Sequence, residues 1–95
     1  MAVPRVLVVA GSDSSGGAGL EADQKVLAAH GCYAMTATTA LTAQNTLGIQ
    51  HVLVTPPLFV ARQINSCLND IKADVVKIGK TLSTHASEIS CLTLV

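Results

Sequence analysis

A glycine-rich segment near the start of the chain holds the residues best suited to binding a small molecule. Residues 11–19 contain four glycines and three serines, and Asp23 follows them. Glycine has no Cβ, so such a backbone adopts positive φ angles and approaches a ligand closely. The apolar residues 6–10 predict a buried strand just before the segment, and open α/β sheets bind ligands outside the carboxyl ends of their strands. A plain strand-to-helix turn is the alternative for this segment taken alone.

Two phosphate-binding motifs begin in a similar way, and the chain satisfies neither. A P-loop needs a lysine and then a serine or threonine after Gly16, where this chain has Gly17 and Ala18. The dinucleotide-binding pattern is met at residues 17–22, but it also needs an acidic residue about 20 positions further on. No acidic residue occurs between Gln24 and Asn69. We therefore expect neither a P-loop site nor a nicotinamide or flavin dinucleotide site.

The composition argues against several classes of partner. Six basic and six acidic residues give a net charge of zero and are dispersed along the chain, so no surface for nucleic acid or anionic lipid is expected. Neither a signal peptide nor an apolar run of about 18 residues is present. We expect a cytoplasmic protein of one small domain at most, with no nucleic-acid or membrane partner.

Cysteine and histidine show no metal-binding pattern. The three cysteines are widely spaced and odd in number, and the three histidines share no ligand spacing. We expect reduced cysteines, histidines with structural or surface roles, and no metal site. The residues concerned are Cys32, Cys67, Cys91, His30, His51 and His85.

The hydrophobic pattern predicts alternating strands and helices. The expected elements are a strand over 6–10, a helix over 19–30 capped by Gly31, a strand over 33–41, a helix beginning near Pro56 and Pro57, and a strand over 73–79. Residues 45–48 are expected to form a loop, and residues 52–54 a short extra strand. The buried face of the second helix is expected to consist of Leu58, Ala61, Ile64, Leu68 and Ile71.

This β-α-β-α-β order predicts an open parallel sheet with flanking helices and right-handed crossovers. A parallel sheet of three strands leaves an edge and parts of both faces uncovered. We therefore expect these residues to be part of a larger domain.

Three motifs resemble those of a known enzyme family. They are Ala10-Gly11-Ser12-Asp13-Ser14-Ser15-Gly16-Gly17-Ala18-Gly19 with Ala22-Asp23, Thr39-Ala40-Leu41-Thr42-Ala43-Gln44-Asn45-Thr46, and Val76-Lys77-Ile78-Gly79. Through them the chain resembles the hydroxymethylpyrimidine and hydroxymethylpyrimidine-phosphate kinases of thiamine biosynthesis, a branch of the ribokinase-like kinases. The resemblance implies an α/β fold, the N-terminal part of a ribokinase-like open parallel sheet. Residues 1–79 are then expected to be a partial kinase domain, its substrate-binding half, and residues 80–95 a divergent tail.

The resemblance also implies which residues bind substrate. It places Asp23 on the polar groups of the substrate, Gln44 on the pyrimidine ring, and the main chain of Thr42 beside that ring. Gly11 contributes backbone to the same pocket. The residues expected to shape the loop are Gly16, Gly17 and Gly19.

Elementary chemistry supports two of these roles. Asp23 shares a predicted helix face with Leu20 and Leu27, so its carboxylate is expected to face the sheet and to need hydrogen-bond donors. The alternative is an acid near a helix start that only backbone N–H groups stabilise. Gln44 follows the second predicted strand, on the same sheet edge as Gly11, and its amide both donates and accepts, as an aminopyrimidine requires.

The chain departs from the family pattern after Gly79. Family members continue with Met-Leu, and that methionine covers the pyrimidine face, whereas this chain has Lys80-Thr81-Leu82. The family's nucleotide-binding and catalytic segments lie further along and have no counterpart in these 95 residues. We therefore expect a truncated chain that has no catalytic residue and is inactive by itself. The resemblance implies ATP and Mg²⁺ for full-length members.

The sequence thus predicts a lineage of enzymes that use ATP to phosphorylate hydroxymethylpyrimidine and then its monophosphate. Two alternatives are a non-catalytic pyrimidine-binding or interaction fragment and a relative of the pyridoxine-type kinases. A further alternative is a fragment that does not fold alone, because three strands and two helices bury little core. The resemblance leaves a homodimer open for full-length members.

Overall fold

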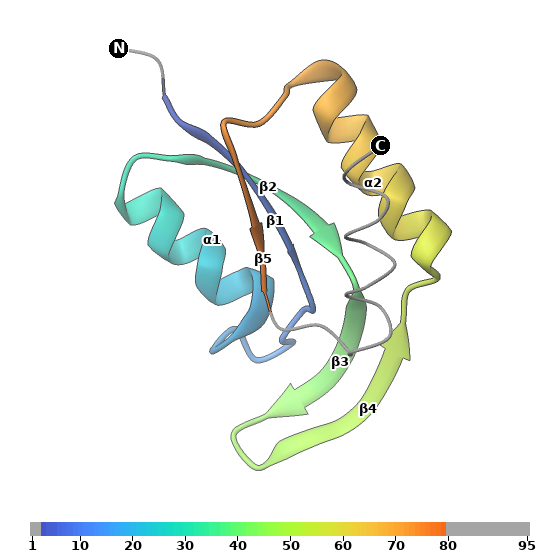
Figure 1. Ribbon diagram of the computed structural model, residues 1–95. Helices are drawn as coiled ribbons and strands as arrows, with labels where there is room; N and C mark the ends of the chain where they lie inside the picture. The colour runs from blue at the N-terminus through green and yellow to red at the C-terminus, as the bar shows by residue number, and fades with distance from the viewer. Residues whose placement is uncertain (1–2, 80–95) are drawn as a thin grey trace.

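Strands and helices alternate along the N-terminal half of the chain and give way to a hairpin in its middle. The computed structural model describes residues 3–79 (Figure 1). Its elements are β1 (Arg5–Ala10), α1 (Gly19–Ala29), β2 (Tyr33–Thr38), β3 (Ala40–Asn45), β4 (Gly48–Val54), α2 (Pro57–Asp70) and β5 (Val75–Ile78).

The central layer is a three-stranded parallel sheet in the order β2-β1-β5. Strand β1 lies in the middle, and its apolar residues Leu7, Val8 and Val9 are completely buried. Successive side chains of a strand point to opposite faces, so these residues pack into the apolar clusters on both faces of the sheet. The α/β fold and the parallel sheet predicted from the sequence are confirmed.

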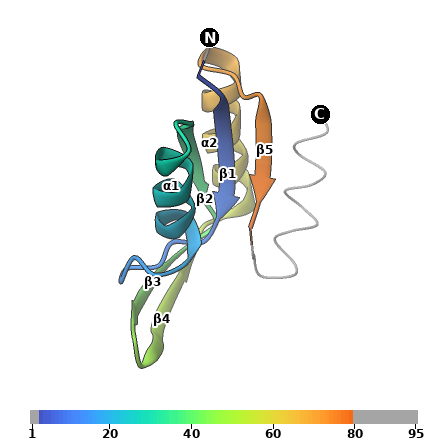
Figure 2. The same ribbon diagram turned by 90° about the vertical axis from the view of Figure 1, so that its left-hand side faces the viewer.

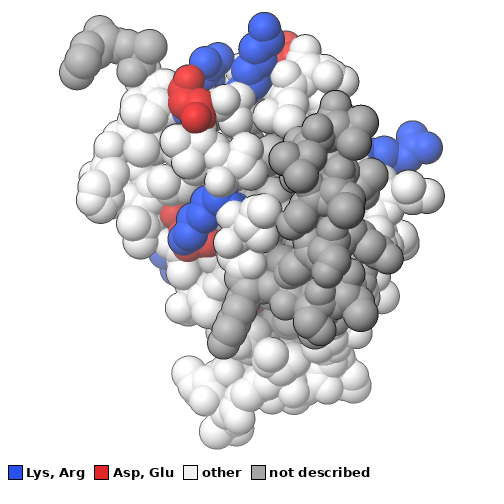
Figure 3. All heavy atoms as spheres, in the orientation of Figure 1, with Lys and Arg blue, Asp and Glu red and all other residues white. Residues whose placement is uncertain are grey.

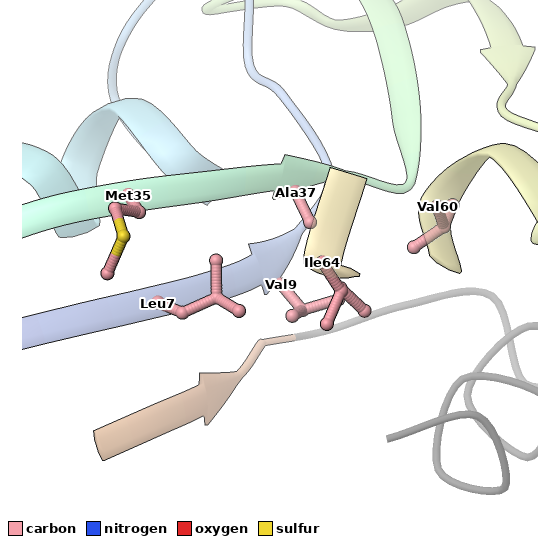
Figure 4. Close-up of a cluster of buried hydrophobic side chains, with 6 residues drawn as sticks. All are labelled: Leu7, Val9, Met35, Ala37, Val60 and Ile64. Carbon is pink, nitrogen blue, oxygen red and sulfur yellow. The ribbon is translucent and has the colours of Figure 1, made fainter. Parts of the chain in front are cut away.

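Helix α2 covers one face of the sheet. Figure 4 shows side chains from β1, β2 and α2 meeting there: Leu7, Val9, Met35, Ala37, Val60 and Ile64. Ala61 and Ile64 are buried as the periodicity predicts, but the prediction for Leu58 is wrong, since its side chain is 74% exposed. Leu58 lies in the first turn of α2, beside the buried stripe of Val60, Ala61 and Ile64 rather than within it.

Helix α1 covers the other face, where Leu20 packs with Val6, Val8 and Ala10. The helix ends as the sequence predicts, because Gly31 has a φ of +72° and its N–H donates to the Ala28 carbonyl over 3.0 Å.

The middle of the chain differs from the prediction. The expected strand over 33–41 ends at Thr38, and residues 40–45 form a separate strand that pairs antiparallel with β4. The expected loop over 45–48 contains the hairpin turn, and the expected strand over 52–54 is the end of the longer β4. Thr39 lies between the two sheets and is hydrogen-bonded to residues at the end of a strand in each. Its N–H donates to the Ala10 carbonyl, and its carbonyl accepts from the Thr55 N–H. The hairpin extends past the carboxyl ends of the parallel strands (Figure 2).

Charged side chains are sparse on the outside of the described residues. Figure 3 shows a few Lys, Arg, Asp and Glu side chains mixed on one face, with most of the described surface uncharged. Among residues 3–79, no helix is long and apolar enough to cross a membrane.

One ion pair fastens the start of β1 to the segment before β5. Arg5 Nη2 lies 3.1 Å from Asp74 Oδ1, while the Arg5 backbone N–H donates to Asp74 Oδ2 over 2.8 Å. The same guanidinium donates to the Ile71 carbonyl over 2.8 Å. Hydrogen bonds from the Arg5 side chain, and then from its backbone, hold the pKa of the Asp74 carboxyl below its usual range.

This pair makes stability depend on pH. Because the pKa of Asp74 is lower in the folded chain, its contribution is present above the unfolded-state value of about 4 and is lost as pH falls through the folded-state value. We expect Asp74→Asn to lower the thermal midpoint at pH 7 and the difference from the unsubstituted chain to vanish in acid. Asp70→Asn, at an exposed position, is the control. Thermal midpoints are measured by circular dichroism. Equal midpoints for Asp74→Asn and the unsubstituted chain at pH 7 would contradict a stabilising role for the ion pair of Arg5 and Asp74.

Candidate functional site

The glycine-rich segment between β1 and α1 is folded by its own aspartate. Asp13 is only 4% exposed, and its carboxylate accepts from Ser15 N–H and Oγ over 2.9 and 2.7 Å and from Gly17 N–H over 3.1 Å. The hydrogen bond from the Ser15 hydroxyl, followed by that from its N–H, lowers the pKa of Asp13. With these donors engaged, Asp13 shapes the loop. This role of Asp13 was not predicted, although Asp followed by Ser and Gly is typical of such turns.

Glu21, in the first turn of α1, ties the helix back to the loop. Its carboxylate accepts from Ser12 Oγ over 2.6 Å and from Asp13 N–H over 2.8 Å. Partial burial raises the pKa of Glu21, but the hydrogen bonds from Ser12 and Asp13 outweigh it, and the net pKa lies below the usual value. This is a second acidic residue with a structural role that the sequence analysis missed.

Gly19 lets the two ends of the segment touch. Its φ is +59°, and a Cβ placed on it would lie 2.3 Å from the Gly11 carbonyl oxygen. The Leu20 N–H donates to that same oxygen over 2.9 Å. Gly16 also has a positive φ, of +83°, whereas Gly17 does not. Gly17 instead lies beside the Asp13 carboxylate, to which its N–H donates.

The loop is joined to strand β3 by a set of hydrogen bonds. Ser12 N–H donates to the Ala40 carbonyl over 2.8 Å, and Thr42 Oγ1 donates to the Ser12 carbonyl over 2.8 Å. Ser14 N–H lies 3.4 Å from Thr42 Oγ1. The hairpin is therefore fixed against the glycine-rich segment through the Ala40 carbonyl and the Thr42 side chain.

Gln44 lies at a bulge in β3. The pairing register shifts between Ala43 and Gln44, a feature that re-aims side chains. The Ser14 hydroxyl accepts from Gln44 N–H over 2.7 Å and donates to the Gln44 carbonyl over 2.8 Å. Gln44 Oε1 lies 3.2 Å from Thr42 Oγ1. The Gln44 Nε2 donors have no hydrogen-bond partner among residues 3–79. Gln44 was expected just after the second strand of the parallel sheet and instead lies on β3 of the hairpin, where it contacts Ser14 of the glycine-rich segment.

Asp23 follows the glycine-rich segment, on helix α1. It is half-buried on α1 and accepts a 2.7 Å hydrogen bond from Lys77 of β5. Its carboxylate faces the sheet side, and its partner is a lysine side chain rather than backbone N–H groups. Within residues 3–79, no hydrogen bond links Asp23 to Gln44 or Thr42.

The structure offers no metal site within the part of the chain that it describes, since it contains no group of three or more His, Cys, Asp or Glu. A cavity of about 300 Å³ lies at the opposite end of the sheet, at the amino ends of β1 and β2. Its lining of Val3, Arg5, Tyr33 and Ile71 is mostly apolar, and Arg5 is already bonded to Asp74. This cavity includes none of the predicted site residues.

The chain matches one protein-family model over most of its length. The model of the family described as phosphomethylpyrimidine kinase matches residues 13–93. A chloroplastic thiamine biosynthetic bifunctional enzyme of Arabidopsis thaliana is 53% identical over 87 residues, which cover 92% of this chain and 17% of that protein. The match to the family model thus continues into residues 80–93, which the structure does not describe.

Two solved structures share the fold. A phosphomethylpyrimidine kinase from Clostridium difficile superposes with a TM-score of 0.88 at 38% identity, covering 98% of this chain and 40% of that one. A pyridoxal kinase from Staphylococcus aureus, in complex with pyridoxal, gives 0.83 at 29% identity, covering 99% and 35%. The chain therefore spans less than half the length of each protein compared.

The close approach at Gly19 predicts an unequal cost for two glycine substitutions. Gly19→Ala and Gly31→Ala each place an alanine at a positive φ, which costs about 1–2 kcal/mol, but only Gly19 would also press a Cβ against backbone. We expect Gly19→Ala to lower the free energy of unfolding by clearly more than Gly31→Ala. Urea titrations followed by circular dichroism measure both, and equal losses would show that the contact between Gly11 and Gly19 is not a constraint.

The two hydrogen bonds of the Ser14 hydroxyl are expected to stabilise the hairpin against local opening. Ser14→Ala removes two hydrogen bonds to the Gln44 backbone, each worth about 1 kcal/mol net. We expect amide hydrogen exchange in residues 40–54 to accelerate at least about fivefold, with little change in β1 and β2. Ser66→Ala, at an exposed position on α2, is the control. Unchanged exchange in the hairpin would contradict the role of Ser14.

Proposed function

The chain belongs to the phosphomethylpyrimidine kinase family, and on that premise we propose that its described residues form the pyrimidine-binding part of an ATP-dependent kinase. The reaction is the phosphorylation of hydroxymethylpyrimidine and of its monophosphate in thiamine biosynthesis. The observation that carries this proposal is the attachment of Gln44 and Thr42 to the glycine-rich segment through Ser12 and Ser14.

Gln44 supplies the recognition chemistry for an aminopyrimidine. Its amide has donors on Nε2 and an acceptor on Oε1, which suits a ring nitrogen next to an exocyclic amino group. The bulge and the Ser14 hydroxyl fix the backbone from which this side chain extends. A binding group that is fixed before the ligand arrives loses less entropy on binding.

Asp23 and the glycines complete the proposed pocket. Asp23 would accept hydrogen bonds from polar groups of the substrate, while Gly11 and the main chain of Thr42 would line the ring. Gly16, Gly17 and Gly19 shape the loop, because they allow its tight turns and its closure onto Gly11. We propose these roles on the resemblance together with the positions described above.

ATP and Mg²⁺ are assigned to other parts of the family enzyme. The described residues do not suit either group, because the loop has no lysine after Gly16 and residues 3–79 hold no cluster of metal-binding side chains. We therefore assign phosphoryl transfer to none of these residues. We expect the 95-residue chain by itself to bind the pyrimidine without turning over ATP.

A pyridoxal-type ring is the second candidate substrate. The specific observation in its favour is the similarity to the pyridoxal kinase of Staphylococcus aureus solved with pyridoxal. A non-catalytic interaction fragment is a further alternative. We propose a cytosolic protein with a small-molecule partner and no nucleic acid, and a homodimer for full-length members.

Calorimetric titration of the 95-residue chain tests the proposal. We expect hydroxymethylpyrimidine to bind more tightly than pyridoxal, and Asp23→Ala and Gln44→Leu each to weaken its binding about tenfold, because each removes a hydrogen-bonding group from the ligand. Asp70→Ala and Gln24→Leu change matched exposed side chains and should have no effect.

Two outcomes would contradict this account. Tighter binding of pyridoxal would favour the second substrate. In a coupled assay of ATP consumption, turnover that disappears in Asp23→Ala would show that this chain is itself a kinase.

A further inference from the structure

An ion pair between Asp23 and Lys77 ties helix α1 to the edge strand β5. Lys77 Nζ lies 2.7 Å from Asp23 Oδ1, across 54 positions of sequence. The Asp23 side chain is 21% exposed and that of Lys77 is 52% exposed. A single contact between side chains that retain this much contact with water usually adds little to stability. Arg5 and Asp74 also make backbone hydrogen bonds, whereas Lys77 and Asp23 share one side-chain contact, so stability alone does not explain a lysine at this position.

The register of the sheet directs Lys77 toward α1. Lys77 lies beside Val8 of β1 in the parallel pairing, and paired residues of neighbouring strands share a face. Val8 belongs to the apolar cluster under α1, together with Leu20. Asp23 follows Leu20 by three positions and so lies on the same side of the helix. The strand and the helix thus present the two charges to each other.

The lysine occupies only one of the two carboxylate oxygens. Lys77 donates to Oδ1, and across residues 3–79 no donor lies within hydrogen-bond distance of Oδ2. A carboxylate has about four acceptor positions, so Asp23 retains the capacity to accept from a ligand. Gly79 N–H donates to the Val9 carbonyl over 2.8 Å, which holds the end of β5, and with it Lys77, against β1.

We propose that Lys77 is a positioning residue for Asp23. It holds one carboxylate oxygen and so fixes the direction in which the other accepts a hydrogen bond from a hydroxyl or amino group of the substrate. Lys77 acts through Asp23 and does not contact the substrate. The inference rests on the proposed function, because it requires Asp23 to bind the pyrimidine.

A double-substitution cycle on the 95-residue chain tests this role. Dissociation constants for hydroxymethylpyrimidine are measured by calorimetry for the unsubstituted chain, Lys77→Met, Asp23→Ala and the double variant. We expect Lys77→Met to weaken binding about tenfold in the unsubstituted chain and to have no further effect once Asp23 is alanine, because contacting residues are energetically coupled. Lys77→Arg, which keeps the charge and the donor, should recover most of the affinity.

Two further measurements separate positioning from a purely structural role. Arg62→Met removes an exposed cation from α2 and should leave affinity unchanged. The thermal midpoint of each variant is recorded, and titrations are made well below it. Lys77→Gln, which keeps a donor but no charge, should show an intermediate loss of affinity at an unchanged midpoint.

The results of this cycle distinguish the role of Lys77 from the proposed binding of the pyrimidine. If the unsubstituted chain binds and Lys77→Met binds equally well, or loses the same factor with and without Asp23, Lys77 does not position Asp23. If the unsubstituted chain does not bind the pyrimidine, the proposed function fails for this chain, and the role of Lys77 fails with it.

Discussion

The candidate site depends on the contact between the glycine-rich segment and strand β3. Ser12, Ser14 and Thr42 join a loop from one sheet to a strand of another, and the loop accommodates this because Gly19 lets it close onto Gly11. A side chain at Gly19 would separate these backbones. The polar groups of the loop and the hairpin therefore hold each other in place before any ligand is present.

Two acidic residues of the loop and helix have structural roles, and a third remains available. Asp13 and Glu21 accept hydrogen bonds from the loop's own hydroxyl and N–H groups, and these bonds lower the pKa of each carboxyl. Asp23 instead meets a lysine through one oxygen. This division separates residues that build the pocket from a residue that can act in it.

Local pattern was sufficient to predict the central strand, both helices, the edge strand and the glycine-rich motif. The apolar run 6–10 and the glycine at position 31 act over a few residues and are visible in the sequence. The hairpin was missed because Thr46 and Leu47 carry no Asn-Gly type of turn signal. Every residue of β4 is exposed, so burial imposes no alternating pattern on that strand. The pairing of Asp23 with Lys77 depends on strand order, which local pattern does not contain.

The central claim is that an aminopyrimidine binds where the glycine-rich segment meets the hairpin, and intermolecular nuclear Overhauser effects test it most directly. In the complex of the 95-residue chain with hydroxymethylpyrimidine, we predict effects from the protons of the pyrimidine to the Gln44 side-chain amide and to the Gly11 N–H. Effects to Tyr33 and Ile71 instead, at the cavity on the opposite end of the sheet, would contradict the account.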